Sequence, residues 1–383
     1  MKILHTIPGL RLTAGGPPLS VSLTVLGLRD LKVDVDILAY DVKSSEDKNI
    51  IEGDFIHLLP SPNERRFVYS RYFTKWLRES EKVYDLYHCQ GVWQYPSFAM
   101  ARFARKNKKP YIITPRGMLY PQIFQNNPFA KSLLWNFLLK EDIQKASCVH
   151  VTCIEEMEHL RKRGITSPMA VIPNPVDIDS FLSNDIKEKD EKFRLGYLGR
   201  IDPRKHIDRL INAWAELGDK VENGELLIMG AGDTTHHEFL KNEVRRLGLK
   251  NVVFTGFVSG QAKVDAINSL SYLVVTSDFE NFGMIIAEAL MHRVPVITSK
   301  GTPWEELIHH DCGWWIDNDK ETVKSAILVA HAVPEEKRKQ MGINGQNLIL
   351  KNYSKDVVAK KVKALYEWLI SSAEKPEFVY LER

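Results

Sequence analysis

The chain has 383 residues, of which 44% are hydrophobic, 26% charged and 10% aromatic. This composition excludes a disordered, collagen-like or coiled-coil chain, and the length predicts two or three domains. The formal net charge is only +3. Because proteins devoted to nucleic acid are usually more basic, no nucleic-acid partner is expected. The four cysteines form no Cys-x-x-Cys pair, which indicates buried, reduced thiols rather than a disulfide framework.

No segment has the length expected of a membrane span. The longest strongly apolar run is Ser132–Leu139 (SLLWNFLL), far short of the ~20 residues that cross a bilayer. The N-terminal run MKILHTIPGL is broken by Pro8 and Gly9 and lacks the features of a signal peptide. We therefore expect a cytoplasmic protein, either soluble or peripherally attached to the inner face of the cytoplasmic membrane.

Strands and helices alternate along the first half of the chain. An apolar strand at Lys2–Ile7 leads through a Gly/Pro-rich loop to a helix at Leu19–Leu31 and a strand at Val33–Ala39. This order is the strand–helix–strand unit of a parallel sheet. Further strands are predicted at Leu86–His88, Pro110–Thr114, Cys148–Val151 and Ala170–Ile172, and helices at Pro96–Arg105 and Ile154–Arg163.

A polar, charged stretch near residue 180 divides the chain, and the alternation resumes after it. The strands expected in the second half are Phe193–Leu198, Glu225–Met229, Val252–Thr255, Tyr272–Thr276 and Val294–Thr298. The helices expected there are Ile207–Leu217, His237–Leu247, Ala262–Leu270 and Gly283–Met291, and a last helix is expected at Val357–Ile370. We predict an α/β protein with two Rossmann-like, doubly wound parallel-sheet domains facing a cleft. The predicted divisions are 1–178 for the first domain, 179–192 for a linker, 193–356 for the second domain and 357–383 for a helix that returns to the first.

Charge is distributed unevenly between the halves. Residues 1–190 hold 26 Lys or Arg against 22 Asp or Glu, and residues 101–150 hold nine against two. A second basic stretch, Glu64–Arg78, is rich in aromatic residues, and Tyr69, Tyr72, Phe73 and Trp76 would share one helix face. One interpretation is an amphipathic helix packed on the first domain. The other is a face that docks onto an anionic membrane or an anionic acceptor.

The strongest chemical signal lies at Ser277–Leu290 (SDFENFGMIIAEAL). A strand runs into a loop that carries Glu280, and a helix that carries Glu288 starts near Gly283. The N-terminus of a helix offers unpaired N–H groups and the positive end of a dipole, which suit a phosphate. A carboxylate beside such a site is suited to sugar hydroxyls. Each glutamate by itself would be ordinary, because glutamate favours the first turns of helices.

A second signal follows the first strand of the second domain, at Gly199–Lys205 (GRIDPRK). Arg200 and Lys205 stand at the carboxyl end of that strand, where two cations would fit a diphosphate. The alternative is that both cations make surface salt bridges with Asp202 and Asp208.

Together, G-R-x4-K and E-x7-E in the second of two Rossmann-like domains resemble the retaining, nucleotide-sugar-dependent glycosyltransferases of family 4, which have the GT-B fold. VIPNPVD at residues 171–177 is similar to the family's V-I-P-N-G-V-D, with Pro175 in place of glycine. Similar segments are Gly230–Asp233, FTGFVSG at 254–260, and the glycines Gly15 and Gly16. Residues 301–315 resemble bacterial enzymes that build surface polysaccharide or lipopolysaccharide.

The resemblance implies transfer of a hexose-type sugar from a nucleotide sugar, such as a UDP- or GDP-sugar, to a glycan or lipid-linked acceptor, with no further cofactor. It implies that Arg200 and Lys205 bind the diphosphate, Glu280 the sugar hydroxyls and Glu288 the ribose. Other implied donor contacts are Gly15, Gly16, Gly232, Val258, Asn281, Phe282, Gly283, Met284 and Ile285.

The first domain carries weaker marks of the same family. YHCQG at residues 87–91 resembles the family's H-x-H-G segment, with Gln90 at the second histidine. Arg116 stands where many relatives place a histidine that touches the donor sugar, so the resemblance implies His88 and Arg116 as catalytic candidates. For His88 the alternative is a buried, hydrogen-bonded histidine. Tyr366 and Trp368 of the last helix are expected to pack on this domain.

A metal is not expected. Three D-x-D matches, at 34–36, 177–179 and 317–319, resemble a metal motif of a different glycosyltransferase fold, and each is interpreted as incidental. The alternatives are a nucleotide-sugar epimerase on the same fold and a non-catalytic sugar-binding protein. A dinucleotide-dependent oxidoreductase is disfavoured, because no G-x-G-x-x-G follows the first strand.

Overall fold

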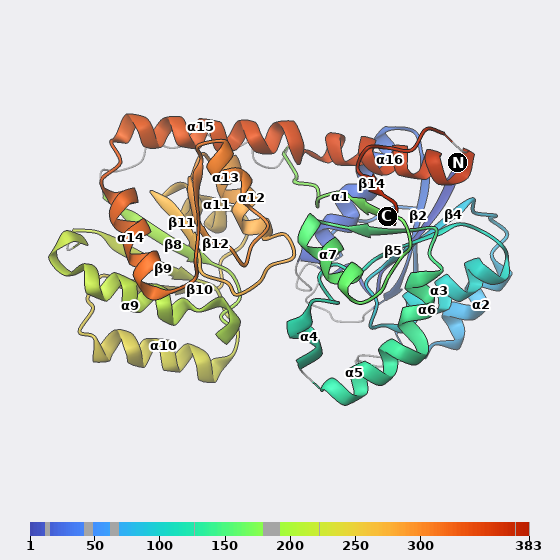
Figure 1. Ribbon diagram of the computed structural model, residues 1–383, viewed down its shortest axis with the longest axis horizontal. Coiled ribbons are helices and arrows are strands. Elements are labelled where there is room, and N and C mark those ends of the chain that lie inside the picture. The colour runs from blue at the N-terminus through green and yellow to red at the C-terminus, as the bar shows by residue number, and fades with distance from the viewer. Residues whose placement is uncertain are drawn as a thin grey trace. The chain divides into compact units, whose positions relative to one another are not determined.

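The computed structural model describes residues 1–11, 16–41, 49–61, 69–125, 127–178, 192–221, 223–371 and 373–382. The chain forms two compact units (Figure 1). Unit 1 comprises Met1–Pro175 and Lys355–Arg383, and unit 2 comprises Val176–Ser354. Of the stretch 179–192 expected as a linker, only Lys192 belongs to the described residues. Each unit is built on a parallel sheet with helices on both faces, which confirms the predicted fold class.

The sheet of unit 1 has the strand order β14-β7-β6-β5-β4-β1-β2-β3 among the described residues. Its strands are β1 (Lys2–Thr6), β2 (Asp34–Asp41), β3 (Ile56–Pro60), β4 (Leu86–Gln90), β5 (Tyr111–Thr114), β6 (Cys148–Val151), β7 (Met169–Val171) and β14 (Val379–Tyr380). Neighbouring strands are parallel except β14, which is antiparallel to β7. Its helices are α1 (Gly16–Asp30), α2 (Arg71–Glu79), α3 (Tyr95–Lys106), α4 (Pro121–Gln125), α5 (Pro128–Leu134), the π-helix η2 (Trp135–Leu139), α6 (Lys140–Gln144), α7 (Ile154–Lys162) and α16 (Lys355–Ser371).

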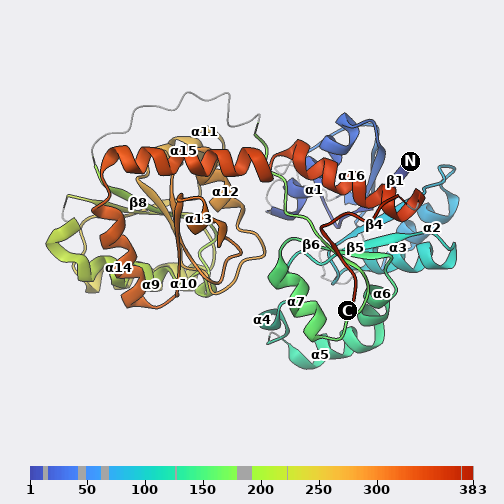
Figure 2. The ribbon, with the colours of Figure 1, turned by 45° about the horizontal axis from the view of Figure 1, so that its top comes forward.

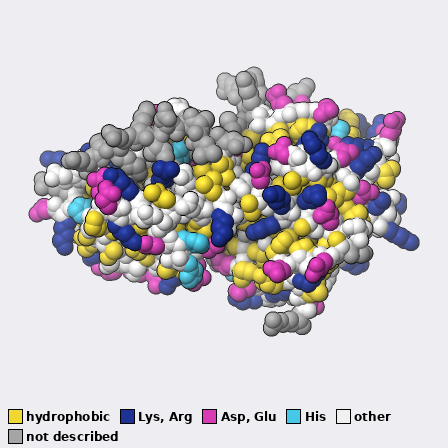
Figure 3. Space-filling view, turned by 90° about the horizontal axis from the view of Figure 1, so that it is seen from above, with side chains coloured by type: hydrophobic (Ala, Val, Ile, Leu, Met, Phe, Trp, Pro, Cys, Tyr) yellow, Lys and Arg dark blue, Asp and Glu magenta, His cyan; other side chains and the backbone are white. Residues whose placement is uncertain are grey.

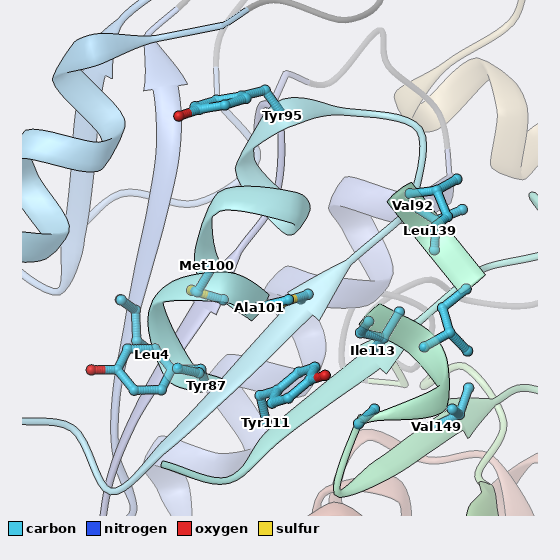
Figure 4. Close-up of a cluster of buried hydrophobic side chains, with 14 of the residues drawn as sticks. Leu4, Tyr87, Val92, Tyr95, Met100, Ala101, Tyr111, Ile113, Leu139 and Val149 are labelled. Atoms are coloured by element: carbon cyan, nitrogen blue, oxygen red, sulfur yellow. The ribbon is translucent and has the colours of Figure 1, made fainter. Parts of the chain in front are cut away.

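The two faces of this sheet bury separate cores, because successive side chains of a strand point to opposite faces. Ile3 of β1 lies in the core that α1 and α16 cover. Leu4 lies in the other core, with Phe73 of α2 and Met100 of α3. Figure 4 shows part of that second core, where side chains of the strands meet those of α3. In Figures 1 and 2, α16 lies beside α1 on the first face.

The sheet of unit 2 has the order β10-β9-β8-β11-β12-β13 and is parallel throughout its described strands. The strands are β8 (Arg194–Leu198), β9 (Glu225–Met229), β10 (Val252–Gly256), β11 (Tyr272–Val275), β12 (Val296–Ser299) and β13 (Gly313–Ile316). The helices are η3 (Pro203–Lys205), α9 (Ile207–Leu217), η4 (Gly218–Val221), α10 (Thr234–Arg246), α11 (Gly260–Asn268), α12 (Met284–Met291), α13 (Glu306–His309), α14 (Lys320–His331) and α15 (Glu335–Asn352). Helices α9, α10 and α14 pack on one face, and α11, α12 and α15 on the other.

Side-chain capping explains one difference from the predicted boundaries. Helix α10 begins at Thr234, three residues before the expected start, because the Asp233 side chain accepts a hydrogen bond from the backbone N–H of His236 at 2.7 Å. Asp233 is therefore the N-cap, a position that aspartate favours.

The basic, aromatic stretch does not present one aromatic face to solvent. Residues 62–68 lie outside the described residues, and α2 begins only at Arg71, after Ser70 as its N-cap. Phe73 is fully buried, whereas Tyr69 and Tyr72 are exposed. The expectation of a shared aromatic face is therefore wrong, because the helix turns Phe73 into the core and Tyr72 outward. This arrangement is that of an amphipathic helix packed on unit 1.

Charged side chains of both signs are interspersed on the face seen in Figure 3, with hydrophobic side chains between them. No helix in the described part of the chain combines the length and the apolar character that a membrane span requires. The four cysteines are unpaired, and Cys89, Cys148 and Cys312 are buried.

Packing of the C-terminal helix on α1 predicts a stability effect that can be measured. Leu365 of α16 is fully buried in the core that contains Val25 and Leu28 of α1. Leu365→Ala is expected to lower the free energy of unfolding of unit 1 by about 2–5 kcal/mol, because it removes buried methyl groups and leaves a cavity. Lys360→Ala, at an exposed position of the same helix, should change it by less than about 0.5 kcal/mol. Urea unfolding of both variants checks this, and equal midpoints would contradict it.

Candidate active site

Two loops of unit 2 meet at the carboxyl edge of its sheet. One follows β8 and the other follows β11, and these strands are neighbours and parallel. The Thr276 hydroxyl donates to the backbone oxygen of Lys205 at 2.8 Å, and the backbone N–H of Asp278 donates to that of Arg204 at 3.0 Å. The two loops are thus joined by hydrogen bonds, which hold the residues they carry at fixed separations.

Glu280 and Lys205 form an ion pair between these loops. The Ser277 hydroxyl donates to the same carboxylate oxygen, Oε1, at 2.9 Å. The backbone N–H of Glu280 donates to the oxygen of Gly301 at 2.7 Å. Within the described residues, Oε2 of Glu280 accepts no hydrogen bond. The carboxylate is therefore fixed in place and keeps one oxygen available to a ligand.

Arg200 occupies the exposed rim of the same edge. Its side chain is 63% exposed, and Nη2 donates to Oδ2 of Asp202 at 2.9 Å. Arg204 also binds Asp202, and this hydrogen bond lowers the pKa of Asp202 to about 2. The salt bridge to Asp202 that the sequence left as an alternative is thus present for Arg200. The side chain of Lys205 instead pairs with Glu280, and with neither Asp202 nor Asp208 among the described contacts.

The start of helix α12 is shaped by Gly283, Phe282 and Trp304. Gly283 has φ of 77°, a left-handed conformation that glycine adopts without strain. Phe282 is buried, and the indole Nε1 of Trp304 donates to its backbone oxygen. The side chain of Phe282 therefore packs in the core, and only its backbone is available to a ligand. Met284 and Ile285 begin the helix and are partly buried.

Glu288 lies further along α12 and is nearly buried. Its Oε2 lies 2.5 Å from Nζ of Lys263 in α11. Lys263 carries no recognisable signal of this role, because a contact between two helices 25 positions apart leaves no local pattern in the sequence. Glu288 is thus charge-compensated without a ligand.

Close backbone approach explains the glycine at 232. A Cβ added to Gly232 would lie 2.1 Å from the backbone oxygen of Ile201, so only glycine allows the loops after β8 and β9 to pair. Val258, the other residue implied near a base, is partly buried in the core of unit 2.

Unit 1 carries its own polar cluster, centred on Arg116. Arg116 follows β5 and has a φ of 54°, which is uncommon for a residue other than glycine. The buried carboxylate of Glu156 accepts from the backbone N–H of Gly117 at 2.5 Å and holds this turn. Burial lowers the pKa of Arg116 to about 10, so it stays charged at neutral pH. Of the two glycines implied near the donor, Gly16 begins α1 and Gly15 lies outside the described residues.

His88 is fully buried and both of its ring nitrogens are bonded. Nδ1 lies 2.7 Å from the Tyr366 hydroxyl, and Nε2 lies 2.7 Å from the Thr114 hydroxyl. Burial lowers the pKa of His88 well below its usual value. This placement favours the alternative of a buried, hydrogen-bonded histidine. The expected packing of Tyr366 on unit 1 is present, and its hydroxyl also contacts His5.

The D-x-D matches lie in ordinary structural settings. Asp36 pairs with Lys82 at 2.8 Å, Asp317 pairs with Lys300 at 3.0 Å, and Asp319 caps α14. Asp179 lies outside the described residues. Among the described residues, no three His, Cys, Asp or Glu side chains gather as a metal site would require.

Comparison with known proteins agrees with this fold. A family model described as "Glycosyl transferases group 1" matches residues 179–348, and one described as "Glycosyl transferase 4-like domain" matches residues 15–175. An uncharacterized glycosyltransferase of Methanocaldococcus jannaschii is 28% identical over 363 residues, which is 93% of this chain and 95% of that protein.

A second relative is a GDP-mannose-dependent alpha-(1-6)-phosphatidylinositol dimannoside mannosyltransferase of Mycobacterium tuberculosis, 30% identical over 147 residues and 38% of this chain. The chain spans only 37–38% of the length of the curated relatives that it matches at 30% identity or above. Among solved structures, Anabaena HepE in complex with UDP and glucose has a TM-score of 0.69 and 18% identity, covering 95% of this chain and 99% of that one.

The two family matches between them take in most of the chain, and each falls largely within one unit. Together with the two parallel-sheet domains, these matches support a group 1 glycosyltransferase of the GT-B fold.

The buried histidines of unit 1 predict a pH dependence of stability. Burial lowers the pKa of His150 from 6.5 to about 4. Below pH 6.5 the imidazole of His150 is protonated in the unfolded chain but not in the folded one. The free energy of unfolding is therefore highest above pH 6.5 and falls as the pH falls toward 4. His150→Gln is expected to reduce the slope of unfolding free energy against pH in this window by about 1.4 kcal/mol per pH unit. Urea unfolding at several pH values checks this.

His310→Gln is the matched control, because His310 is exposed on unit 2. Its slope should equal that of the wild type, and an unchanged slope for His150→Gln would contradict the prediction.

Proposed function

We propose that the protein transfers a hexose-type sugar, with retention of configuration, from a nucleoside-diphosphate sugar to a glycan or lipid-linked acceptor. The observation that carries the proposal is the fixed carboxylate of Glu280, held by Lys205 beside the N-terminal end of α12. That arrangement offers cations and helix N–H groups to a diphosphate, and a carboxylate oxygen to sugar hydroxyls.

Breaking the bond between sugar and diphosphate builds negative charge on the leaving group. Fixed positive groups stabilise this charge most strongly in the transition state, where it is largest. Lys205 is part-buried and already held in place, so it needs little reorganisation to meet a phosphate. Arg200 is exposed on the rim and can leave Asp202 to close over the diphosphate.

Glu280 acts in this scheme by binding hydroxyls, with Oε2 as the acceptor. We do not assign it as a nucleophile, because its other oxygen is engaged by Lys205 and Ser277. The acceptor hydroxyl then attacks on the face that the diphosphate leaves, and a phosphate oxygen takes its proton. Glu288 would hold the ribose hydroxyls, in exchange for part of its contact with Lys263.

The comparisons support a nucleotide sugar as the donor. The mycobacterial relative is named for its dependence on GDP-mannose, and the Anabaena structure contains UDP and glucose. We infer that the acceptor belongs to surface polysaccharide or lipopolysaccharide assembly, on the resemblance of residues 301–315 to such enzymes. We propose further that transfer is independent of a metal ion.

A transfer assay with Glu280→Gln tests the function. The wild type should release nucleoside diphosphate from a UDP- or GDP-sugar only when an acceptor is present, with unchanged anomeric configuration and an unchanged rate in EDTA. Glu280→Gln should lower kcat by at least about 100-fold, because the neutral amide weakens hydrogen bonds that tighten in the transition state. Rates and product anomers by NMR provide the measurement.

Glu238→Gln is the matched control, since Glu238 is exposed on α10 of the same unit and should leave kcat unchanged. Turnover without an acceptor would indicate an epimerase instead. Undiminished transfer by Glu280→Gln would refute the assignment of the site.

We propose that unit 1 also contacts an anionic membrane, through α5 and η2. Phe129, Leu133 and Phe137 are 83%, 50% and 72% exposed, and their spacing of four residues places them along one side of these helices. Residues 121–140 hold two lysines and no acidic residue. Exposed aromatic side chains with neighbouring cations are typical of helices that lie in the interface of an anionic bilayer.

Vesicle flotation tests this contact. The wild type should float with vesicles that contain phosphatidylglycerol, and the double variant Phe129→Ser, Phe137→Ser should not, because it removes the apolar side chains that would enter the interface. Phe239→Ser, a substitution of an exposed aromatic residue on unit 2, should float like the wild type. Equal flotation of the double variant and the wild type would rule out this surface.

A further inference from the structure

On the face of the unit 1 sheet that α1 and α16 cover, four neighbouring strands change from apolar to polar side chains toward their carboxyl ends. In β1, β4, β5 and β6 the first residues on this face are apolar, and those nearer the carboxyl end are polar. The apolar positions are Ile3, Leu86, Ile112 and Cys148, and the polar positions are His5, His88, Gln90, Thr114 and His150. These polar side chains are almost completely buried, so they need hydrogen-bond partners inside the fold.

Hydrogen bonds join several of them into a continuous path from helix α16 to Arg116. The Tyr366 hydroxyl lies 2.7 Å from Nε2 of His5, and Nδ1 of His5 lies 3.2 Å from the side-chain nitrogen of Gln90. The side-chain oxygen of Gln90 accepts from Nε of Arg116 at 2.9 Å. From Tyr366 a second branch runs to His88 and on to Thr114.

The arginine fixes the direction of every bond in this path. Arg116 can only donate, so Gln90 must turn its oxygen to Arg116 and its amide nitrogen to His5. Nδ1 of His5 is then the acceptor, and Nε2 carries the proton and donates to Tyr366. Tyr366 in turn donates to Nδ1 of His88. His5 and His88 are therefore neutral, each with its proton on Nε2, which agrees with the lowering of both pKa values by burial.

The same path leaves one part of Arg116 available. Nε is bound by Gln90, and Nη1 donates to the hydroxyl of Ser20 at 3.0 Å and to the side-chain oxygen of Asn174 at 2.9 Å. Within the described ranges, Nη2 makes no hydrogen bond. Arg116 is partly exposed, and it stands past the carboxyl end of β5, the edge where open parallel sheets bind ligands.

We propose that Tyr366 is a positioning residue, which holds Arg116 through His5 and Gln90 so that Nη2 of Arg116 meets the substrate. The inference rests on the proposed function, because it assigns Arg116 to the reaction. It makes the C-terminal helix a functional part of unit 1 rather than packing alone. Tyr366 does not touch the substrate itself and takes no part in bond making.

Steady-state kinetics of variants along the path test the proposal. Tyr366→Phe and Gln90→Met should each lower kcat by about 10- to 100-fold with little change in the donor KM, because a displaced Arg116 stabilises the transition state less. Gln90→Glu should recover part of the loss relative to Gln90→Met, since it keeps an acceptor oxygen for Arg116 but removes the donor to His5. Tyr111→Phe is the control: it removes a buried tyrosine hydroxyl of unit 1 that donates to the backbone oxygen of Asp142, away from the path.

A kcat of Tyr366→Phe equal to that of Tyr111→Phe would overturn the proposal. If Tyr366→Phe does not fold, the two Gln90 variants test the proposal instead. Equal kcat values for Gln90→Met and Gln90→Glu would overturn it.

The tautomers give a readout that does not depend on turnover. Nitrogen-15 NMR of the histidine-labelled 383-residue protein should show His5 and His88 neutral at pH 7 with the proton on Nε2. A proton on Nδ1 of His5, or a charged His5, would overturn the path. If the wild type transfers no sugar, the proposed function fails, and the tautomers alone then decide whether the path from Tyr366 to Arg116 exists.

Discussion

The ion pair between Lys205 and Glu280 is the contact on which the candidate donor site depends. It exists because β8 and β11 are parallel neighbours, so that the loops after them leave the sheet at the same edge. Hydrogen bonds between the two loops then fix the separation of the charges. A diphosphate that binds here would meet a cation and a carboxylate that are already oriented, which is the condition under which electrostatic stabilisation of a leaving group is strongest.

The carboxyl edge of the unit 1 sheet carries a different set of polar side chains. Its carboxyl-end side chains on the α1 and α16 face are buried histidines, a glutamine and a threonine, and the glutamine, Gln90, accepts a hydrogen bond from Arg116. Burial keeps the histidines neutral, because a charged imidazole would lose its hydration there. The only charge that remains in the path is that of the arginine, whose guanidinium stays protonated at neutral pH. A cation therefore stands here where many members of the family that the sequence resembles have a titratable histidine.

Several elements with strong apolar patterning could be predicted from the sequence, but not all: no helix was expected at α14, although its buried residues Val323, Ala326, Ile327 and Ala330 follow a helical period. The strand at Tyr272–Val275 is fully buried and was predicted within one residue of its end. Helix α15 was missed because, of its 18 residues, only Met341, Gly342, Gly345, Leu348 and Ile349 are buried. Glu280 and Glu288 of the candidate donor site could be found from their motif, but only one of their two ion-pair partners could. Lys205 carries a recognisable spacing, whereas Lys263 and the link from Tyr366 to His5 depend on tertiary contacts over 25 and 361 positions.

The most direct test of the proposed donor site is thermal unfolding of the 383-residue protein against UDP, GDP, ADP and CMP. A ligand that binds only the folded state stabilises it by about 2.7 kcal/mol at 100 times its dissociation constant. We expect a nucleoside diphosphate to stabilise the wild type by this amount, and Lys205→Met to remove most of the shift. The absence of a shift with every nucleotide, or an equal shift in Lys205→Met, would contradict this expectation.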